Sequence, residues 1–543
     1  MAAKEILKFC IEKGFLLDKE VLDLLNESNG IDTETGKLII EKIGAFAQKR
    51  VITRSVFDQN KEKLNQILFN LPGENKTQVE KLKIKLGINI EISREINEEE
   101  VRNIVKGRVR EIKPPLNVRD VGELNLSGVK ILSMDPTSSK KIEVADFVKH
   151  YRNRYSEMSN LFKERGELEN LSSINKISGN NKNISIVGLV NGKKITKNKN
   201  LLIELEDLTG KITVIVNANK PDLFKKAEDI ALDSVIAVKG TGSKEILFVN
   251  EIYFPDSNLA ERKKSPVEEY ALFTGDIHVG IDKFLENNFM KFIHYLNGRL
   301  PGAKSEEVDK IKYLFLVGDI VAGVGIYPGQ EHELLIADVE EQYVKAAELL
   351  KKIREDITII VSPGNHDALR IMEPQPLLDE KFAWPLYELK NVVLTGNPAL
   401  VNIGEKRSKE LAFSGFDVLT YHGYSYHHYA NTIPRLMQEK AVHTPEKIMS
   451  YLLKNRHLAP THSSTLYFPS VEDSLFIRKV PDIFLSGHTH KSGVTYYNNV
   501  LVISSSCWES LTAFQEKTGN KPDFCKVPMF NMKTREVKIL DFE

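Results

Sequence analysis

Five short polar clusters recur in order through the second half of the chain, and each one closes a hydrophobic run. The clusters read Asp276-Ile277-His278, Gly318-Asp319, Gly364-Asn365-His366-Asp367, His422-Gly423 and Gly487-His488-Thr489-His490. The runs before them read YALFTG, KYLFLVG, ITIIVSPG, FDVLTY and DIFLSG. Short apolar runs bounded by Gly or Pro are typical of buried strands. Because side chains at the ends of several strands can converge on one point, the clusters predict a shared site.

The side chains of this set are of one chemical kind, which indicates what the site binds. A single Asp-x-His pair is common by chance, but all five clusters occupy the same position after a predicted strand. The donors are carboxylates, imidazoles and an amide, with no cysteine among them. Such donors suit Mn, Fe, Zn or Mg ions. The sequence therefore predicts a metal-dependent hydrolytic site.

Length, charge and cysteine content limit the class of protein. A chain of 543 residues is long enough for about three or four domains. The formal net charge is zero, so any contact with nucleic acid must come from a local patch or a partner. The three cysteines, Cys10, Cys507 and Cys525, are too widely spaced for a disulfide framework. No apolar run is long enough to span a bilayer, and the N-terminus lacks the apolar core of a secretory signal, so we expect a cytoplasmic protein without a membrane partner.

The first part of the chain contains no recognisable catalytic or metal-binding motif. Apolar residues three and four apart predict a small helical module over residues 1–72. Charged residues and Pro114-Pro115 then predict a linker or partly disordered arm over 73–143, with a folded domain as the alternative.

Residues 144–260 are expected to form a helix followed by a small β-domain. One apolar stripe at helical spacing predicts a helix over 144–168, and core packing explains that stripe. Short β-branched segments separated by turn signals follow over 183–257, and they resemble an OB-fold barrel. An OB-fold can bind single-stranded nucleic acid or dock a protein. Because no run of exposed aromatic residues is evident, both uses stay open.

Residues 261–543 alternate strands with helices, which predicts an α/β layered domain. Helical patterns are expected over 284–300, 332–355 and 444–455. The fold class is therefore multidomain α/β, with a helical module, an OB-fold β-barrel and an α/β domain that carries the site.

The ordered pattern D-x-H, G-D, G-N-H-D, H-G and G-H-x-H resembles the calcineurin-like metallophosphoesterase superfamily, most closely its nuclease branch. The resemblance implies a four-layer αββα domain and a pair of divalent ions. It implies that the first ion is held by Asp276, His278 and His490. The second ion would be held by Asn365, His422 and His488, and Asp319 would bridge the two ions.

The same resemblance implies that His366 is the catalytic residue, which protonates the leaving oxygen and does not bind metal. Asp367 would either orient that imidazole or face solvent. Mn²⁺ is the expected ion by analogy, with Mg²⁺, Zn²⁺ and Fe²⁺ left open. His427 and His428 are expected to be packing or surface groups, and no role is predicted for His332, His443, His457 or His462.

The sequence around the second and third clusters favours a phosphodiester substrate. Phosphatases of the serine/threonine type carry arginines in GDxVDRG and RGNHE motifs, whereas this chain has GDIVAGVG and SPGNHDALR. Those segments, together with EPQP, RHLAP and VPDIFLSGHTH, look like the small subunits of archaeal family D DNA polymerases. The resemblance covers about residues 145–543, with GVGIYPGQ and EPQP as its most specific parts. Ala322 departs from it, because that family commonly has Asp there.

The polymerase resemblance implies a proofreading 3′→5′ exonuclease that acts on a single-stranded 3′ end of DNA in complex with a large catalytic subunit. One alternative is a catalytically silent accessory subunit, although all predicted ligands are present. The other is a free-standing break-repair nuclease or a cyclic-nucleotide phosphodiesterase. A break-repair nuclease has its phosphoesterase motifs at the N-terminus, whereas here about half of the chain precedes the first ligand.

Overall fold

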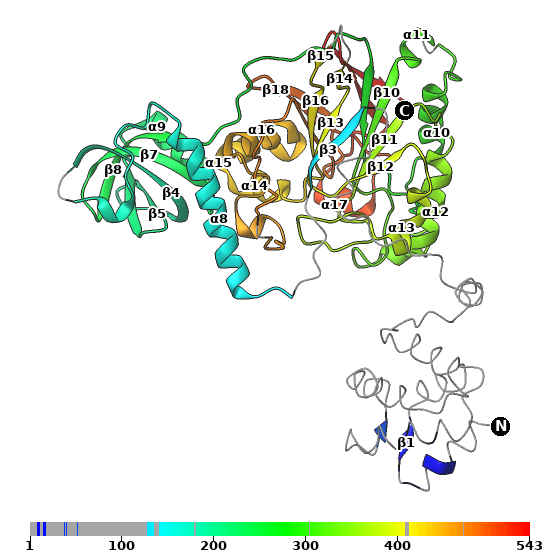
Figure 1. The fold of residues 1–543 in the computed structure, drawn as a ribbon, viewed down its shortest axis with the longest axis horizontal. Coiled ribbons are helices and arrows are strands. Elements are labelled where there is room, and N and C mark those ends of the chain that lie inside the picture. The colour runs from blue at the N-terminus through cyan, green and yellow to red at the C-terminus, as the bar shows by residue number, and fades with distance from the viewer. Residues whose placement is uncertain are drawn as a thin grey trace, which may run out of the picture. The chain divides into compact units, whose positions relative to one another are not determined.

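A computed structural model of the protein describes residues 128–134, 141–178, 181–302, 305–407, 412–470 and 472–543, with a few short pieces before residue 53 (Figure 1). The chain divides into two units, 1–115 and 116–543. In the first unit, β1 (Leu16–Leu17) pairs in parallel with β2 (Val51–Ile52). Most of the helical module expected over 1–72, and most of the linker expected over 73–143, lies outside the described residues. Within the described part of the chain, no helix is both long and apolar enough to cross a bilayer.

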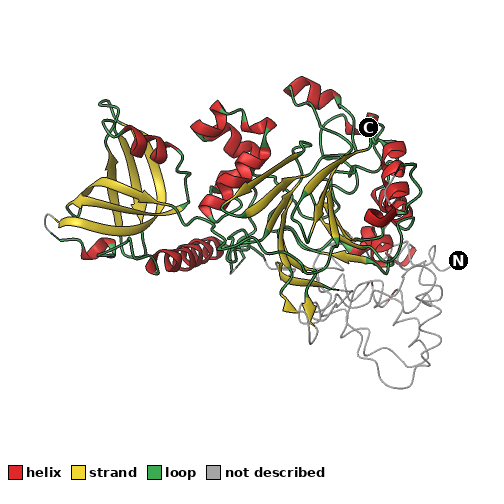
Figure 2. Cartoon of the chain, turned by 90° about the horizontal axis from the view of Figure 1, so that it is seen from above, coloured by secondary structure: helices red, strands yellow, loops and turns green. Residues whose placement is uncertain are grey.

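The described strands of the α/β domain form two six-stranded sheets that face each other (Figure 2). Sheet one has the order β12-β11-β10-β9-β20-β21, with bounds Val392–Leu394, Thr358–Ser362, Ile311–Val317, Tyr270–Thr274, Lys526–Asn531 and Val537–Asp541. Sheet two has the order β18-β19-β17-β16-β13-β3, with bounds Gly493–Tyr497, Val500–Ser504, Ile483–Ser486, Phe416–Tyr421, Ala399–Ile403 and Val129–Met134. The short pair β14 (Lys406–Arg407) and β15 (Ala412–Phe413) extends beside them.

Helices cover the outer face of each sheet, so the domain has the four αββα layers that the sequence predicts. Alternate side chains of β9 face opposite ways, with Leu272 in the helix-facing core and Phe273 in the core between the sheets. Helices α10 (Glu286–Leu296), α12 (Val339–Leu350) and α13 (Glu380–Tyr387) pack on sheet one. Helices α14 (Tyr426–Thr432), α15 (Pro434–Gln438) and α16 (Pro445–Asn455) pack on sheet two. Two shorter helices are α11 (Ser305–Val308) and α17 (Ala513–Thr518).

The strands that precede the polar clusters run in parallel within each sheet. In sheet one, β9, β10 and β11 are parallel neighbours, with Thr274 opposite Leu316 and Val317 opposite Ser362. In sheet two, β16 and β17 are parallel, with Tyr421 opposite Ser486. Because parallel neighbours end at the same edge, the turns after these strands share one side of the domain.

Strand β3 belongs to sheet two, although its residues fall in the segment expected to be a linker. It pairs antiparallel with β13, with Val129 opposite Ile403, and the Val129 side chain is buried between the sheets. Its six residues stand alone beside a charged segment, so their short alternation gives little signal of a strand. The long-range pairing with β13 decides the conformation.

The small β-domain is a closed five-stranded barrel with the order β4-β5-β6-β8-β7, which agrees with the predicted barrel. The strands are β4 (Asn181–Ile195), β5 (Leu201–Glu206), β6 (Lys211–Val216), β7 (Val235–Gly242) and β8 (Ile246–Tyr253). Helix α9 (Pro221–Glu228) lies between β6 and β7 in the chain. Aliphatic side chains such as Ile203 and Val214 fill its interior, which explains the alternating pattern of these segments. Phe248 is the one aromatic side chain among the exposed large hydrophobic residues described in the barrel.

Helix α8 (Val144–Lys163) packs against both domains, and it ends five residues before the expected boundary. Met158 and Phe162 join a core with barrel residues and with Phe476 of the α/β domain. On the same helix, Arg154 is fully buried, and its Nε lies 2.5 Å from Asp473 Oδ2. A buried ion pair thus fastens α8 to the loop that contains Asp473.

Replacement of Asp473 by Asn should destabilise the protein strongly. Burial opposes ionisation of Asp473, but Arg154 together with His457 and His150 outweighs it and holds the pKa of the carboxyl well below its usual range. Asp473→Asn would leave the Arg154 guanidinium buried without a counter-charge, so we expect a loss of about 3–5 kcal/mol in the free energy of unfolding. Chemical denaturation measures this loss. Glu157→Gln, which breaks the exposed pair with Arg478, is the control and should cost at most about 1 kcal/mol. Equal effects of both substitutions would contradict this account.

His457 should make the stability of the protein depend on pH. Burial and the neighbouring Arg154 lower the pKa of His457 to about 4 against the opposing effect of Asp473, whose Oδ2 lies 2.9 Å from His457 Nε2. His150, the other histidine of this cluster, also contacts Asp473. Below the ordinary pKa of 6.5 the unfolded chain binds a proton that folded His457 does not, so stability is lost as the pH falls from about 6.5 to about 4. Urea denaturation across this window should show a shallower pH dependence for His457→Gln. An unchanged slope would contradict the assignment.

Candidate metal centre

The five turns bring all of the predicted site residues into one cluster at the edge of the two sheets. Asp276 and His278 follow β9, Asp319 follows β10, and Asn365 and His366 follow β11. From sheet two, His422 follows β16, while His488 and His490 follow β17. Three overlapping groups have potential ligand atoms that all lie within 4.8 Å of one another: Asp276, His278 and His490; His278, Asp319 and His366; Asp319, His422 and His488.

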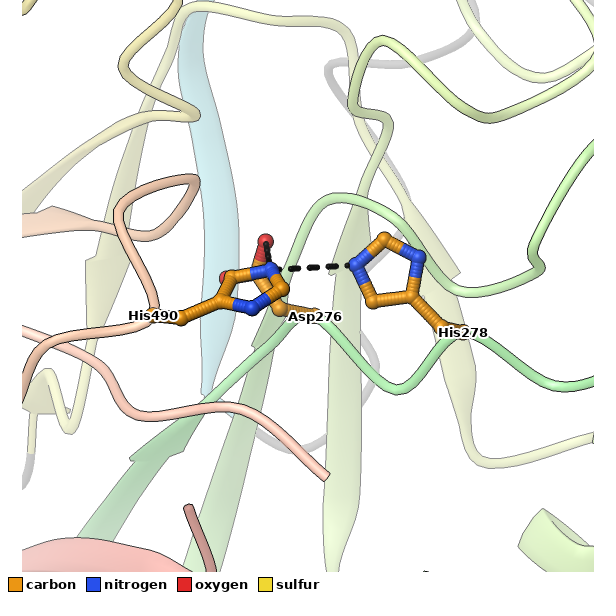
Figure 3. A group of neighbouring side chains, drawn as sticks. All are labelled: Asp276, His278 and His490. Atoms are coloured by element: carbon orange, nitrogen blue, oxygen red, sulfur yellow. Dashed lines mark hydrogen bonds and ion pairs between the residues drawn. The ribbon is translucent and has the colours of Figure 1, made fainter. Parts of the chain in front are cut away.

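The first group draws one carboxylate and two imidazoles from both sheets (Figure 3). Nε2 of His278 lies 3.2 Å from Nε2 of His490. The same nitrogen of His490 lies 3.6 Å from Oδ1 of Asp276. Asp276 also accepts hydrogen bonds from the backbone N–H of His488 at 3.0 and 3.1 Å, which joins the turn of sheet one directly to that of sheet two.

The third group, Asp319, His422 and His488, is built around the Asp319 carboxylate and is extended by Asn365. Nε2 of His422 lies 3.0 Å from Oδ1 of Asn365 and 3.3 Å from Oδ2 of Asp319. The His488 ring lies with its centroid 5.0 Å from that of His422. Oδ2 of Asp319 is also 3.8 Å from Nε2 of His278 in the first group. Asp319 therefore lies between the two groups, as a bridging carboxylate would.

The spacing and chemistry of these donors fit divalent ions. Two ligand atoms that each lie about 2.0–2.2 Å from one ion are themselves about 3–3.5 Å apart. The His422–Asn365 and His278–His490 separations, 3.0 and 3.2 Å, fall in this range. The donors are oxygens and imidazole nitrogens, which suit Mn, Fe, Zn or Mg.

Much of the site is held in backbone conformations that non-glycine residues seldom adopt. Five of the predicted ligands have φ between 48° and 68°, in the left-handed region: Asp276, His278, Asp319, His488 and His490. Such conformations persist only where surrounding structure enforces them, and they are common at functional sites. The turns are thus conformationally strained, and this strain accompanies the convergence of the five side chains on one another.

The glycines of the motifs leave room for the ligands. A Cβ at Gly318 would lie 2.0 Å from Nδ1 of His422, and one at Gly364 would lie 2.2 Å from Oδ1 of Asp319. The turns of the two sheets can therefore come this close only because Gly318 and Gly364 have no side chain. This contact explains why the G-D and G-N-H-D motifs begin with glycine.

The charges in the cluster are strongly coupled. Burial opposes ionisation of Asp319, but His422 and His366 outweigh it and hold the pKa of the carboxyl well below its ordinary range. In return, Asp319 overcomes burial and raises the pKa of His422 to about 9. Burial and neighbouring imidazoles lower the pKa of His278 and His488 well below the ordinary value. Neutral imidazoles and an ionised carboxylate are the forms that bind a metal ion.

His366 is more exposed than the ligands His278 and His422, and hydrogen bonds hold its orientation. Its Nδ1 lies 2.8 Å from the carbonyl oxygen of Ala322, and its backbone N–H donates to Asp319 Oδ1 at 2.8 Å. Its Nε2 lies 4.0 Å from Asp319 Oδ2. The carbonyl keeps the proton on Nδ1 and leaves Nε2 toward the cluster.

Asp367 has neither of the roles considered for it from the sequence. It is buried and accepts hydrogen bonds from the Gly364 N–H at 2.8 Å and from the Tyr343 hydroxyl at 3.0 Å. Burial and the nearby Asp319 raise its pKa to about 6. It therefore shapes the turn around Asn365, while a backbone carbonyl orients His366. Sequence spacing alone does not distinguish these two neighbours.

Other polar residues near the centre carry no motif that sequence reasoning could use. The ring of His427, expected to be a packing or surface group, makes an edge contact with His488 at a centroid separation of 5.6 Å. Tyr424 contacts the same imidazole. On the other side, Gln515 Nε2 lies 2.9 Å from Nδ1 of His490, and Glu509 lies 3.6 Å from the same nitrogen.

Comparison with known proteins agrees with the geometry. The calcineurin-like phosphoesterase family matches residues 271–492, which contain every predicted ligand. The DNA polymerase II small subunit of Pyrococcus furiosus is 37% identical over 433 residues, covering 78% of this chain and 68% of that protein. The subunit of the same name from Methanothermobacter thermautotrophicus is 38% identical over 402 residues, or 74% and 80%.

A solved archaeal phosphodiesterase covers 50% of this chain and 98% of its own, at 12% identity and a TM-score of 0.24, which is too weak a likeness to support an assignment. The two polymerase subunits are similar over most of both chains, and they confirm the relationship predicted from the GVGIYPGQ and EPQP segments. The chain therefore belongs to the family of DNA polymerase II small subunits and carries a calcineurin-like phosphoesterase domain.

Proposed function

We propose that this subunit is an active proofreading nuclease, a 3′→5′ exodeoxyribonuclease that hydrolyses phosphodiester bonds at a metal pair. The observation that carries the proposal is the convergence of eight side chains, the seven predicted ligands and His366, in one cluster. An accessory subunit without catalytic activity has no need for five strained ligand positions and a buried set of coupled charges.

The residues divide into two ion-binding groups and a bridge. Asp276, His278 and His490 would hold one ion, and Asn365, His422 and His488 the other. Asp319 would bridge them, since its carboxylate lies between the groups. When bound, two divalent ions act as Lewis acids at the phosphate and make an attacking water more acidic. By family analogy we propose Mn²⁺.

His366 would supply the proton that the leaving oxygen needs. The Ala322 carbonyl holds Nδ1, so an imidazolium at this position presents its second proton from Nε2 toward the cluster. In a 3′→5′ exonuclease the leaving atom is the 3′-oxygen of the penultimate nucleotide. Protonation of that oxygen avoids the release of a strongly basic alkoxide.

The substrate and partner follow from the family and from the surroundings of the site. The described turns at Gly318 and Gly364 lack the arginines that would fork a terminal phosphate, which favours an internal phosphodiester. A small subunit implies a large catalytic subunit as its partner. Because the chain has no net charge, we propose that this partner supplies much of the surface that binds DNA.

Asp319→Ala and His366→Ala should separate metal binding from turnover. Asp319→Ala removes the shared carboxylate, so metal and hydrolysis should be lost together. His366→Ala leaves the ligands intact, so bound metal should stay at the wild-type level while hydrolysis of end-labelled single-stranded DNA falls about 100-fold or more. Metal analysis by mass spectrometry and gel assays with Mn²⁺ measure the two effects.

His443→Ala is the control for these variants, because that residue lies in a short 3-10 helix after α15 and takes no part in the three ligand groups. It should retain both metal and activity. Full hydrolysis by Asp319→Ala or His366→Ala would refute the roles assigned to them.

The polymerase complex tests the biological part of the proposal. We expect the chain to copurify with a large subunit and the complex to remove a mismatched 3′ nucleotide from a labelled primer in Mn²⁺. The His366→Ala complex should still form, and it should extend matched primers but leave mismatched ends in place. A wild-type complex that binds no metal and releases no nucleotide would favour the catalytically silent accessory subunit instead.

A further inference from the structure

Two ligands of the proposed second ion, Asn365 and His422, come from different sheets. Asn365 follows β11 of sheet one, whereas His422 follows β16 of sheet two. Strands within a sheet are kept in register by their hydrogen-bonded ladder, but no ladder joins these two sheets. The 3.0 Å separation between Asn365 Oδ1 and His422 Nε2 must therefore be fixed by other contacts.

His422 Nδ1 lies 3.3 Å from the Val317 carbonyl oxygen of sheet one, and a pair of buried amide side chains, Gln375 and Asn397, adds a connection to the Asn365 turn itself. Gln375 Nε2 donates to the carbonyl oxygen of Gly364, next to Asn365, at 3.1 Å. Asn397 Nδ2 donates to Gln375 Oε1 at 2.7 Å, and the Asn397 Oδ1 accepts from the His422 backbone N–H at 2.9 Å. Three hydrogen bonds in series thus link the two ligand turns.

The bridge is rigid and shielded from water. Gln375 is 2% exposed and Asn397 is 1% exposed. Their backbones also pair, with Gln375 N–H donating to Asn397 O at 2.6 Å and Asn397 N–H donating to Gln375 O at 3.0 Å. Behind them, the Glu373 carboxylate accepts from the Tyr421 hydroxyl at 2.9 Å, and Tyr421 precedes His422. Gln375 and Glu373 are the polar residues of the EPQP segment.

We propose that the Gln375–Asn397 bridge is a positioning element that sets the affinity of the second ion alone. The turn that carries both His488 and His490 has its own connection to sheet one, since Asp276 directly accepts from the His488 N–H. Loss of the amide bridge should free the Asn365 and His422 turns to separate, while Asp276, His278 and His490 stay in place. This inference rests on the metal centre of the proposed function and not on its DNA substrate.

Titration of the chelator-treated full-length chain with Mn²⁺ tests the bridge. The wild type should bind two ions. Gln375→Met keeps the side-chain volume but removes the donor and the acceptor, so one ion should bind as in the wild type and the other about 10–100-fold more weakly. Excess Mn²⁺ should restore the second ion, which it would not do if the substitution simply unfolded the domain.

Gln342→Met is the matched control, since Gln342 is equally buried but its amide bonds the Gly323 backbone and the Ile336 carbonyl, and not Gly364, Asn397 or His422. It should bind both ions with wild-type affinity. If Gln375→Met does not yield folded protein, Gln375→Glu replaces it, because this variant keeps the acceptor for Asn397 and loses the donor to the Gly364 and Arg370 carbonyl oxygens.

The outcomes separate this inference from the function on which it rests. Suppose that the wild type binds two ions and the Gln375 variant either binds both with unchanged affinity or loses both equally. That result would refute the proposed role of the bridge and leave the metal centre intact. A wild type that binds no pair of ions would overturn both.

Discussion

The Asp319 carboxylate is the contact on which the rest of the site depends. Its Oδ2 lies within 4 Å of imidazoles from three turns, those of His278, His366 and His422, and its Oδ1 accepts the His366 N–H. The carboxylate is 2% exposed, so water screens these interactions little. A buried anion surrounded by imidazoles is stable only with positive charge nearby, which protons or divalent ions provide. The architecture around it is therefore suited to exchange protons for metal.

Two sheets, and not one, supply the ligands, and this arrangement imposes the geometry of the whole domain. Parallel strands in each sheet end at a common edge, but only side-chain contacts can set the distance between the edges. Glycine at Gly318 and Gly364 allows the close approach, because a Cβ at either position would collide with the His422 ring of sheet two. Left-handed backbone at five ligand positions then directs the side chains inward. Local strain is thus balanced by contacts that cross between the sheets.

The sequence predicts those parts of the molecule whose structure is determined by the pattern of neighbouring residues. The five strands before the clusters and the barrel follow from periodicity and turn signals, and the ligand turns follow from the type of side chain after each strand. The four layers follow from the family resemblance. Strand β3 was missed because its pairing with β13 is long-range. Asp367 was misjudged, since nothing in its spacing reveals which way the side chain points, whereas His427 is an exposed residue that packs against His488, as expected. Gln375 and Asn397 are separated by a helix, α13, and by β12, so their hydrogen bond is visible only in three dimensions.

The most direct test of the central claim is anomalous X-ray scattering from crystals of the protein soaked in Mn²⁺. Our account predicts two anomalous peaks about 3.5–4 Å apart, one beside Asp276 and His490, the other beside Asn365 and His422, with the Asp319 carboxylate between them. A single peak, or peaks at positions that share no Asp319 oxygen, would contradict it.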